Sequence, residues 1–364
     1  MKKLFSLITM TMLVMSMLPV VFATDVGIGI TPDIGTEDFE PLVWGCDSRV
    51  VTDDNTEPGR ITLGGAAMTE REHNYAFEGE QVKWNVLVMD KNGINKVEDV
   101  FATIGATQGA GNDIEVNCVE DTANVLIDPS CNARILEEQI TTFVPSMMRN
   151  YICTFTVETV DSMDGEYWVT VEATDLDGLS GVMAENEYWY FNPTIGISID
   201  GDLEFEDVRP GTASYSTTLL VGNDADDSSG VMMDMFISGT DFYDSSSSGA
   251  MCPTTNQLSL GAFSYYATSG AYSTADVVAR TVGGAVPDVE NYLNIPYGIG
   301  FNNPNPFYGS AEIIPTAADN QADFSAGNVL SPGSEMAVTF KLMLPEPCNG
   351  DFDSGNIYFW GEAV

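Results

Sequence analysis

Alternation of apolar and polar residues is the feature of this sequence that most restricts how the chain can fold. In "EGEQVKWNVLVMDKNG" (78–93), valine and tryptophan recur at every second position until a turn-forming "DKNG" ends the pattern. Successive side chains of a β-strand point to opposite faces, so this pattern predicts a strand buried on one face. The residues predicted to face inward here and in similar stretches are Val82, Trp84, Val86 and Val88; Tyr167, Val169, Val171 and Ala173; Tyr215, Thr217, Leu219 and Val221; Val231, Met233, Met235 and Ile237; and Met336, Val338, Phe340, Leu342 and Leu344.

Short strands separated by turn signals, with few helical stretches, predict an all-β protein of two tandem Ig-like β-sandwich domains. The first sandwich is expected over 73–193, because Pro193 ends its strand pattern. The second is expected over 194–364. It carries a long insertion, 260–330, rich in Gly, Ser, Ala and Tyr, with a short helix expected near 274–281.

The first residues, 1–23, have the pattern of a secretory signal peptide. Lys2 and Lys3 precede an apolar run, and Val21 and Ala23 occupy the small-residue positions of a cleavage site. The alternative is a membrane anchor, since the run is almost long enough to span a bilayer; we favour cleavage. No second long apolar run follows. We therefore expect a secreted protein of the extracellular cell surface, with no transmembrane segment once the signal is removed.

Between the predicted signal and the first sandwich lies the segment 24–72, which is rich in Gly, Thr, Asp and Pro. It is either an extended arm or the first strand of the sandwich. An arm could lend a strand to a neighbouring molecule by β-augmentation, or fold back on its own domain. We weigh these two outcomes equally.

A strongly acidic composition excludes some partners. The formal charge is −41, with 54 acidic residues against 13 Lys and Arg. Such a surface repels nucleic acid and anionic lipid, which need basic clusters, and it attracts divalent cations. Disorder is the other outcome of high charge, but 44% hydrophobic and 10% aromatic residues indicate packed cores.

Six cysteines in an exported chain predict disulfide bonds. If each domain closes its own bridges, Cys252 pairs with Cys348. The other four allow three connectivities, and the short loop between Cys118 and Cys131 favours that pair. The remaining two cysteines are Cys46 and Cys153.

Two regions resemble known extracellular modules. "YAFEGEQVKWNVLVMDKNG" (75–93) and "GEYWVTVEATDLDG" (165–178) resemble strands of bacterial and archaeal surface Ig-like domains. "LEFEDVRPGTASYSTTLLVGN" (203–223) and "ISGTDF" (237–242) resemble the β-sandwich modules of the abnormal-spindle and Hydin type. The whole is similar to exported cell-surface proteins of small-genome archaea. These resemblances imply a fold and no particular activity.

Two acidic turns are the candidate metal sites. "DLDG" brings Asp175 and Asp177 together after a strand, and "NDADDSSG" holds Asp224, Asp226 and Asp227. Clustered carboxylates are suited to Ca²⁺, the candidate cofactor here. At "DLDG" the alternative, which we favour, is a turn in which Asp accepts backbone hydrogen bonds. At "NDADDSSG" the alternative, which we also favour, is a solvated loop.

Catalytic constellations are weakly represented. The single histidine, His73, lies in a charged stretch and is predicted to be a surface residue. Aromatic clusters at 188–191 and 357–360 are expected to pack in cores rather than stack on sugars. We therefore predict a secreted, non-enzymatic structural protein of a surface layer, filament or adhesin, with self-assembly or other cell-envelope proteins as partners. The alternative is a secreted carbohydrate- or ligand-binding protein whose site lies in 260–330.

Overall fold

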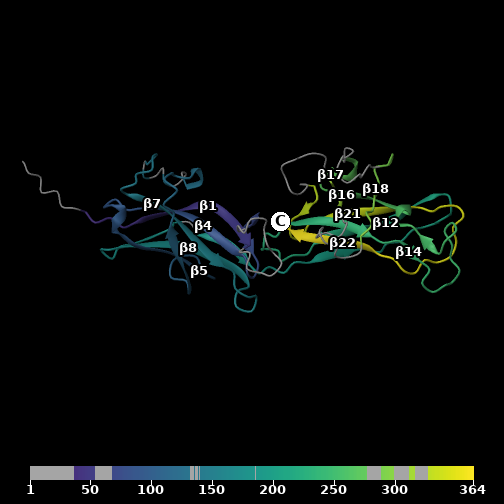
Figure 1. Cartoon of the computed structure of the whole chain (residues 1–364), viewed down its shortest axis with the longest axis horizontal. Helices are drawn as coiled ribbons and strands as arrows, with labels where there is room; N and C mark the ends of the chain where they lie inside the picture. Colours follow the sequence, from purple (N-terminus) through teal and green to yellow (C-terminus); the bar gives the residue numbers. More distant parts are fainter. Residues whose placement is uncertain are drawn as a thin grey trace, which may run out of the picture. The chain divides into compact units, whose positions relative to one another are not determined.

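The part of the chain that the structure describes is all-β, as the alternation predicts (Figure 1). The computed structural model describes residues 37–53, 68–131, 135, 138, 140–184, 186–276, 288–298, 311–315 and 327–364. The predicted signal peptide lies outside these residues, and so do 24–36 and 54–67 of the segment that precedes the first sandwich. Within the described ranges, no helix has the length and apolar character needed to cross a bilayer.

The first half of the chain folds into two facing layers of strands. Their order in the sheet is β2-β1-β4-β7-β6-β5-β8-β10-β3, with β9 paired to β8. Strand β6 links the layers, because its first residues pair with β5 and its last residues pair with β7. The strands are β1 (Leu42–Asp53), β2 (Met68–Glu72), β3 (Tyr75–Ala76), β4 (Gln81–Met89), β5 (Val97–Gly105), β6 (Ile114–Glu120), β7 (Met148–Thr156), β8 (Gly165–Asp175), β9 (Ser180–Val182) and β10 (Glu187–Phe191), with 3-10 turns η1 (Ile94–Lys96) and η2 (Pro129–Cys131).

The core between these layers consists of the residues that the alternation assigns to it. Val82, Trp84, Val86 and Val88 of β4 are buried, and they share a cluster with residues of β5, β8 and β10. Trp84 and Trp189 meet edge-on across the layers, with ring centroids 6.1 Å apart. Edge-to-face aromatic pairs add to the stabilisation from burial alone. Trp189 and Phe191 of β10 are thus core, as expected, whereas Tyr188 and Tyr190 are half-buried, and so is the second aromatic cluster at 357–360.

A second, smaller core covers the outer face of the β1–β4–β7 layer, which simple alternation does not predict. Leu87 and Met89 point away from the main core and are nevertheless fully buried. They pack with Trp44, Cys131 and Met148. The connection between β6 and β7 supplies this cover. Because this connection covers the outer face, both faces of the end of β4 are buried, and the run from Val86 to Met89 is apolar at every position.

The second half forms a second sandwich with an order of β11-β12-β21-β16-β17 in one layer and β13 paired to β19, β20 and β22 in the other. Strand pairing in this half involves only residues after 193 among those described. The strands are β11 (Ile197–Asp200), β12 (Ala213–Asn223), β13 (Met233–Gly239), β14 (Phe242–Tyr243), β15 (Gln257–Leu258), β16 (Phe263–Ser269), β17 (Tyr272–Ser273), β18 (Leu293–Asn294), β19 (Ala311–Glu312), β20 (Val329–Leu330), β21 (Glu335–Met343) and β22 (Ile357–Ala363), with 3-10 turns η4 (Leu260–Ala262) and η5 (Thr274–Asp276).

Four residues of β12 were predicted to face the core, and the prediction is wrong for the first two of them. Leu219 and Val221 are buried, but Tyr215 and Thr217 are exposed. Between Tyr215 and Thr218 the register with β21 shifts, so three steps along β12 match two steps along β21. This β-bulge inserts one residue and reverses which face follows. Tyr215 therefore lies on the outer face, opposite Lys341.

The expectations for the segment 24–72 and for the helix near 274–281 were met only in part. Residues 42–53 and 68–72 are strands of the first sandwich, so the greater part of what is described of 24–72 is not a free arm. The helix expected near 274–281 is a single 3-10 turn at Thr274–Asp276, and 277–281 lie outside the described residues.

Candidate functional site

All six cysteines form disulfides: Cys46–Cys131, Cys118–Cys153 and Cys252–Cys348. The pairing of Cys118 with Cys131 favoured by loop length is therefore wrong. Cys118 lies on β6 directly opposite Cys153 on β7, with Cα atoms 4.0 Å apart. Directly opposed residues of an antiparallel pair come close enough to bridge. Cys118 bonds to Cys153 because β6 lies beside β7 in the sheet, and the spacing of cysteines in the sequence does not reveal which strands are neighbours.

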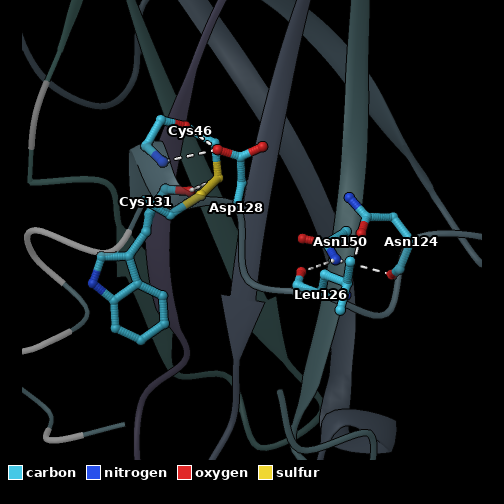
Figure 2. The surroundings of a disulfide bond; sticks show 8 residues. Cys46, Asn124, Leu126, Asp128, Cys131 and Asn150 are labelled. Atoms are coloured by element: carbon cyan, nitrogen blue, oxygen red, sulfur yellow. Dashed lines mark hydrogen bonds between the residues drawn. A yellow bond between two sulfur atoms is a disulfide. The ribbon is translucent and has the colours of Figure 1, made fainter. Parts of the chain in front are cut away.

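The loop 121–131 is held rigidly at both ends (Figure 2). At one end, Cys131 is bonded to Cys46 of β1, and the Asp128 carboxylate accepts hydrogen bonds from the Ser130 amide and hydroxyl at 2.8 and 2.6 Å. These two bonds lower the pKa of Asp128. At the other end, Nδ2 of buried Asn150 donates to the carbonyl oxygens of Asn124 and Leu126, at 2.9 and 3.0 Å.

Apolar side chains are displayed on this rigid frame. Val125 is 57% exposed and Leu126 is 71% exposed, and Val119 on the adjoining strand β6 is 70% exposed. A loop already fixed in one conformation loses little entropy when a partner binds. Exposed apolar groups on a preorganised loop are a feature of interaction surfaces. This loop is the candidate contact surface of the first sandwich.

Replacement of Asn150 by alanine should destabilise the first sandwich by about 1–3 kcal/mol, because two carbonyl groups lose their donor. The change is measured by urea unfolding followed by tryptophan fluorescence, with hydrogen exchange across 121–128 to locate it. Thr122→Ala, on the exposed part of the same loop, serves as the control. Unchanged exchange across the loop in Asn150→Ala would contradict the role assigned to the amide.

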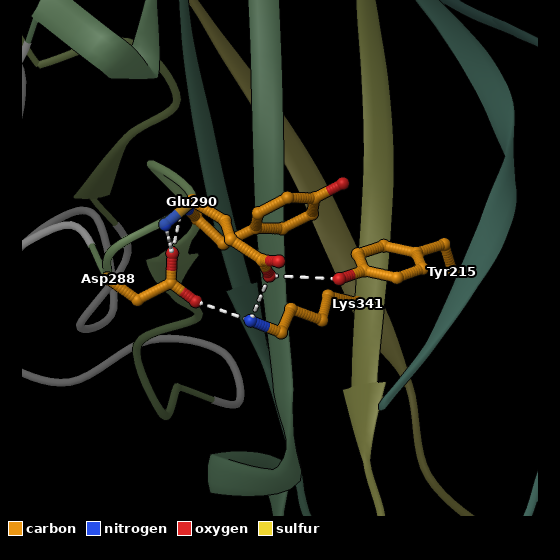
Figure 3. Close-up of polar contacts among 5 residues, drawn as sticks. Tyr215, Asp288, Glu290 and Lys341 are labelled. Carbon is orange, nitrogen blue, oxygen red and sulfur yellow. Dashed lines mark hydrogen bonds and ion pairs between the residues drawn. The ribbon is translucent and has the colours of Figure 1, made fainter. Parts of the chain in front are cut away.

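A second group of residues surrounds Lys341 on the outer face of the β12–β21–β16 layer (Figure 3). Lys341 Nζ donates to Asp288 Oδ2 at 2.7 Å and to Glu290 Oε2 at 2.6 Å, and the Tyr215 hydroxyl donates to the same Glu290 oxygen at 2.9 Å. The bulge in β12 is what brings Tyr215 to this face. The Asp288–Tyr292 turn, which belongs to the insertion, is thereby fastened to the sheet.

Three tyrosine rings gather around this ion pair. Tyr292 lies 5.8 Å from Tyr215 and 5.8 Å from Tyr266, measured between ring centroids. The Lys341 ammonium is 5.5 Å from the centroid of Tyr292. Hydrogen bonds from Lys341 and Tyr215 lower the pKa of Glu290. For Asp288, burial opposes ionisation, but the bond from Lys341 and the backbone amides of Tyr292 and Glu290 lower the pKa overall.

The stability that the Lys341–Asp288–Glu290 contacts give to the second sandwich should depend on pH in one direction. Carboxyl groups whose folded pKa is lowered stabilise the fold above their ordinary pKa values, 3.8 for Asp288 and 4.5 for Glu290, and lose that effect as pH falls further. Lys341→Met should therefore be less stable than wild type at pH 7, and the difference should shrink toward about pH 3. Urea midpoints at both pH values test this, with Lys83→Met as the matched loss of charge. An equal difference at both pH values would show that packing, not charge, is responsible.

The "DLDG" turn has the hydrogen bonds of a turn. Oδ1 of buried Asp175 accepts the backbone amides of Asp177 at 2.9 Å and Leu179 at 2.7 Å. Gly178 has φ of +82°, which suits glycine. Lys96 Nζ lies 2.7 Å from Asp177 Oδ2, so a lysine ammonium already occupies the position of a cation beside that carboxylate.

The "NDADDSSG" turn is also organised by backbone contacts. Asp226 Oδ2 accepts the Thr194 amide at 2.8 Å, and the Asp226 carbonyl accepts the Ser229 amide at 3.0 Å. Asp224 and Asp227 flank it. Across the described residues, no three His, Cys, Asp or Glu side chains come together in an arrangement that could hold a metal ion. Calcium binding by either turn stays a prediction.

His73, predicted at the surface, is half-buried. Its ring stacks on Tyr75 at 5.8 Å between centroids. Burial lowers the pKa of His73, and the neighbouring positive charges of Arg71 and Arg49 lower it further. The imidazole is thus part of a packed, cationic environment.

Sequence reasoning missed Asn150 and Lys341, and a signal for both was present. Lys341 is the one charged residue in the apolar run "FKLML", and Asn150 is a polar residue in a strand, "MRNYICTF", that continues with Tyr151 and Ile152. A buried polar group needs a partner, so such interruptions indicate a specific contact. The partners themselves lie 24 to 53 positions away in the chain.

Comparison with known proteins identifies no family. No protein-family model matches the sequence, and no curated protein matches it. Among solved structures, the C-terminal domain of the AgI/II polypeptide BspA of Streptococcus agalactiae is similar at 10% identity and a TM-score of 0.29, covering 89% of this chain and 96% of that one. A structure titled "Chaperone-tip adhesin complex is vital for synergistic activation of CFA/I fimbriae biogenesis" follows at 10% identity and a TM-score of 0.22, covering 91% and 86%.

Proposed function

We propose that this chain is an exported, non-enzymatic structural protein of the cell surface, acting in a surface layer, a filament or adhesion. The observation that carries the proposal is the complete pairing of cysteines, with every described cysteine in a disulfide. Such bonds persist in oxidising compartments and are rare in the cytosol. The signal-peptide pattern of residues 1–23 supports the same location.

The displayed loop supports a role in contact. Val125 and Leu126 are exposed on a backbone fixed by the Cys46–Cys131 bond and by Asn150. The Ig-like and abnormal-spindle-like resemblances, and the similarity to archaeal surface proteins, belong to this proposal as well. Calcium is its candidate stabilising ion, through the excess of acidic groups.

Carbohydrate binding is the second candidate function, and the tyrosine group around Lys341 favours it. Tyr215 is 47% exposed, and tyrosine rings can stack on the apolar face of a sugar. A glycan array with wild type and Tyr215→Ala tests this reading, with the exposed Tyr272→Ala as control. Sugar binding that Tyr215→Ala alone removes would support it.

Location tests the main proposal most simply. Antibodies against the loop 121–131 should label intact cells that make this protein, without permeabilisation. The protein extracted from those cells should begin after residue 23 and contain no titratable thiol. Labelling only after lysis, with an intact leader and free thiols, would overturn the proposal.

A further inference from the structure

The second sandwich has an open seam on one side. A groove of about 310 Å³ lies between the end of β11 in one layer and β22 in the other. Its walls are Ile199 and Leu203 on one side and Ile357 and Phe359 on the other. Its floor includes the core residues Leu219 and Phe340, and the described residues that line it carry no charge.

Exposure of inward-facing side chains shows that this seam is incompletely covered. On β13, the inward residues Met233, Met235 and Ile237 are at most 1% exposed. On the neighbouring β22, the inward residues Ile357 and Phe359 are only half-buried. Ile199 is 53% exposed and Leu203 is 40% exposed. Among the described strands, β11 pairs only with β12 and β22 pairs only with β13. The seam therefore offers two sheet edges beside an accessible apolar core.

The segment "TDVGIGITPDIGT" (24–36) has the pattern of a strand that would fill such a seam. Val26, Ile28 and Ile30 alternate with glycine, so three apolar side chains would point to one face. The run from Val26 to Ile30 carries no charge and matches the uncharged groove. Once the predicted signal is removed, it lies at the start of the chain.

Reach favours a second copy as the donor. The Phe39 amide is bound to Asn92 Oδ1 at 2.7 Å, at the turn that follows the last residue of β4. The chain leaves the first sandwich at the opposite end of β4, near Gln81, roughly 27 Å away at about 3.4 Å per residue. Ile30 to Phe39 spans roughly 31 Å when fully extended. The extended arm therefore exceeds the length of β4 by only about 4 Å, which leaves little of it to reach a groove in the second sandwich, and the donor considered is a second copy.

We propose that Val26–Ile30 of one copy inserts as a strand into the seam between β11 and β22 of a second copy. This rests on the proposed function as a surface assembly, and it names the contact that would build it. Strand addition supplies backbone hydrogen bonds from the edges and burial of the three side chains. Because each copy has one arm and one groove, the contact is head-to-tail and propagates.

The test uses the chain from Thr24 to Val364. Ile28→Asp with Ile30→Asp disables the arm and leaves the groove free to accept a fluorescent peptide of residues 24–36. That peptide should bind, and a peptide carrying the same two substitutions should bind at least about tenfold more weakly, since each isoleucine buried contributes to affinity. Adding Leu203→Asp to the acceptor should weaken binding as much, whereas adding Val289→Asp, on an exposed turn, should not.

Failure of the proposed seam contact can be distinguished from failure of the proposed function. Absence of peptide binding, or binding that neither the peptide substitutions nor Leu203→Asp weaken, overturns the seam contact even if the protein is found on the cell surface. Specific binding by a protein that stays inside the cell would overturn the proposed function and leave the contact standing. The peptide comparison does not depend on how an acceptor variant folds.

Discussion

Replacing Cys252 and Cys348 together with alanine is expected to lower the free energy of unfolding of the second sandwich by about 2–5 kcal/mol. Both residues are buried, and the bond joins positions separated by 96 residues. A cross-link over so long a loop removes much of the conformational entropy of the unfolded chain. It also ties the connection after β14 to the loop that precedes β22, where Met251 and Asn349 exchange backbone hydrogen bonds.

Trp360 makes this effect measurable in the second sandwich, because the other four tryptophans lie in the first. Urea unfolding should show a lower midpoint for the Trp360 signal, seen by difference against Trp360→Phe. The signal of the first sandwich is the internal control and should keep its midpoint. Equal midpoints with and without the bond, or free thiols at 252 and 348 in the native protein, would contradict the structure.

Asp234→Asn is expected to stabilise the protein at pH 8 by up to about 4 kcal/mol and to change it little near pH 4. Asp234 lies on β13, is 3% exposed and accepts a hydrogen bond from Asn328 Nδ2. Burial raises its pKa to about 7; Asn328 opposes this, and the charges of Glu312 and Glu362 add to it. An acid with a raised folded pKa holds its proton better when folded. The fold therefore loses stability as pH rises from about 3.8 to about 7.

Asparagine cannot ionise and still offers a carbonyl oxygen to Asn328. Removing any negative charge from so acidic a chain could stabilise it slightly, so Asp161→Asn on an exposed turn is the matched control. Urea midpoints across pH 4 to 8 should diverge between wild type and Asp234→Asn as pH rises, and should stay parallel for Asp161→Asn. Parallel curves for both variants would show that Asp234 is ionised at little cost in the folded protein.

Local alternation was enough to predict the strands and most of the core, because a strand places neighbours on opposite faces wherever it sits. It predicted β4, β8 and β21 and the inward residues of β13. It was wrong at Tyr215, because a one-residue bulge leaves no mark in the local pattern. It could not predict that Leu87 and Met89 are buried on the outer face, since a distant connection supplies their cover.

Features that depend on which strands become neighbours could not be predicted. The pairing of Cys118 with Cys153 follows from β6 lying beside β7, and the contacts of Asn150 and Lys341 follow from loops that return to a sheet face. The "DLDG" turn illustrates the reverse case, because its turn chemistry was evident locally and the backbone amides bound to Asp175 fit it. At "NDADDSSG" a solvated loop was expected, and the amide of the distant Thr194 bound to Asp226 could not be predicted.

Electron microscopy of the purified chain from Thr24 to Val364, with calcium and with chelator, tests most directly whether this is a structural surface protein. We expect ordered fibres or arrays in at least one condition, and their loss in the Ile28→Asp, Ile30→Asp variant. Separate single particles in every condition and at every concentration, with the disulfides intact, would contradict the account.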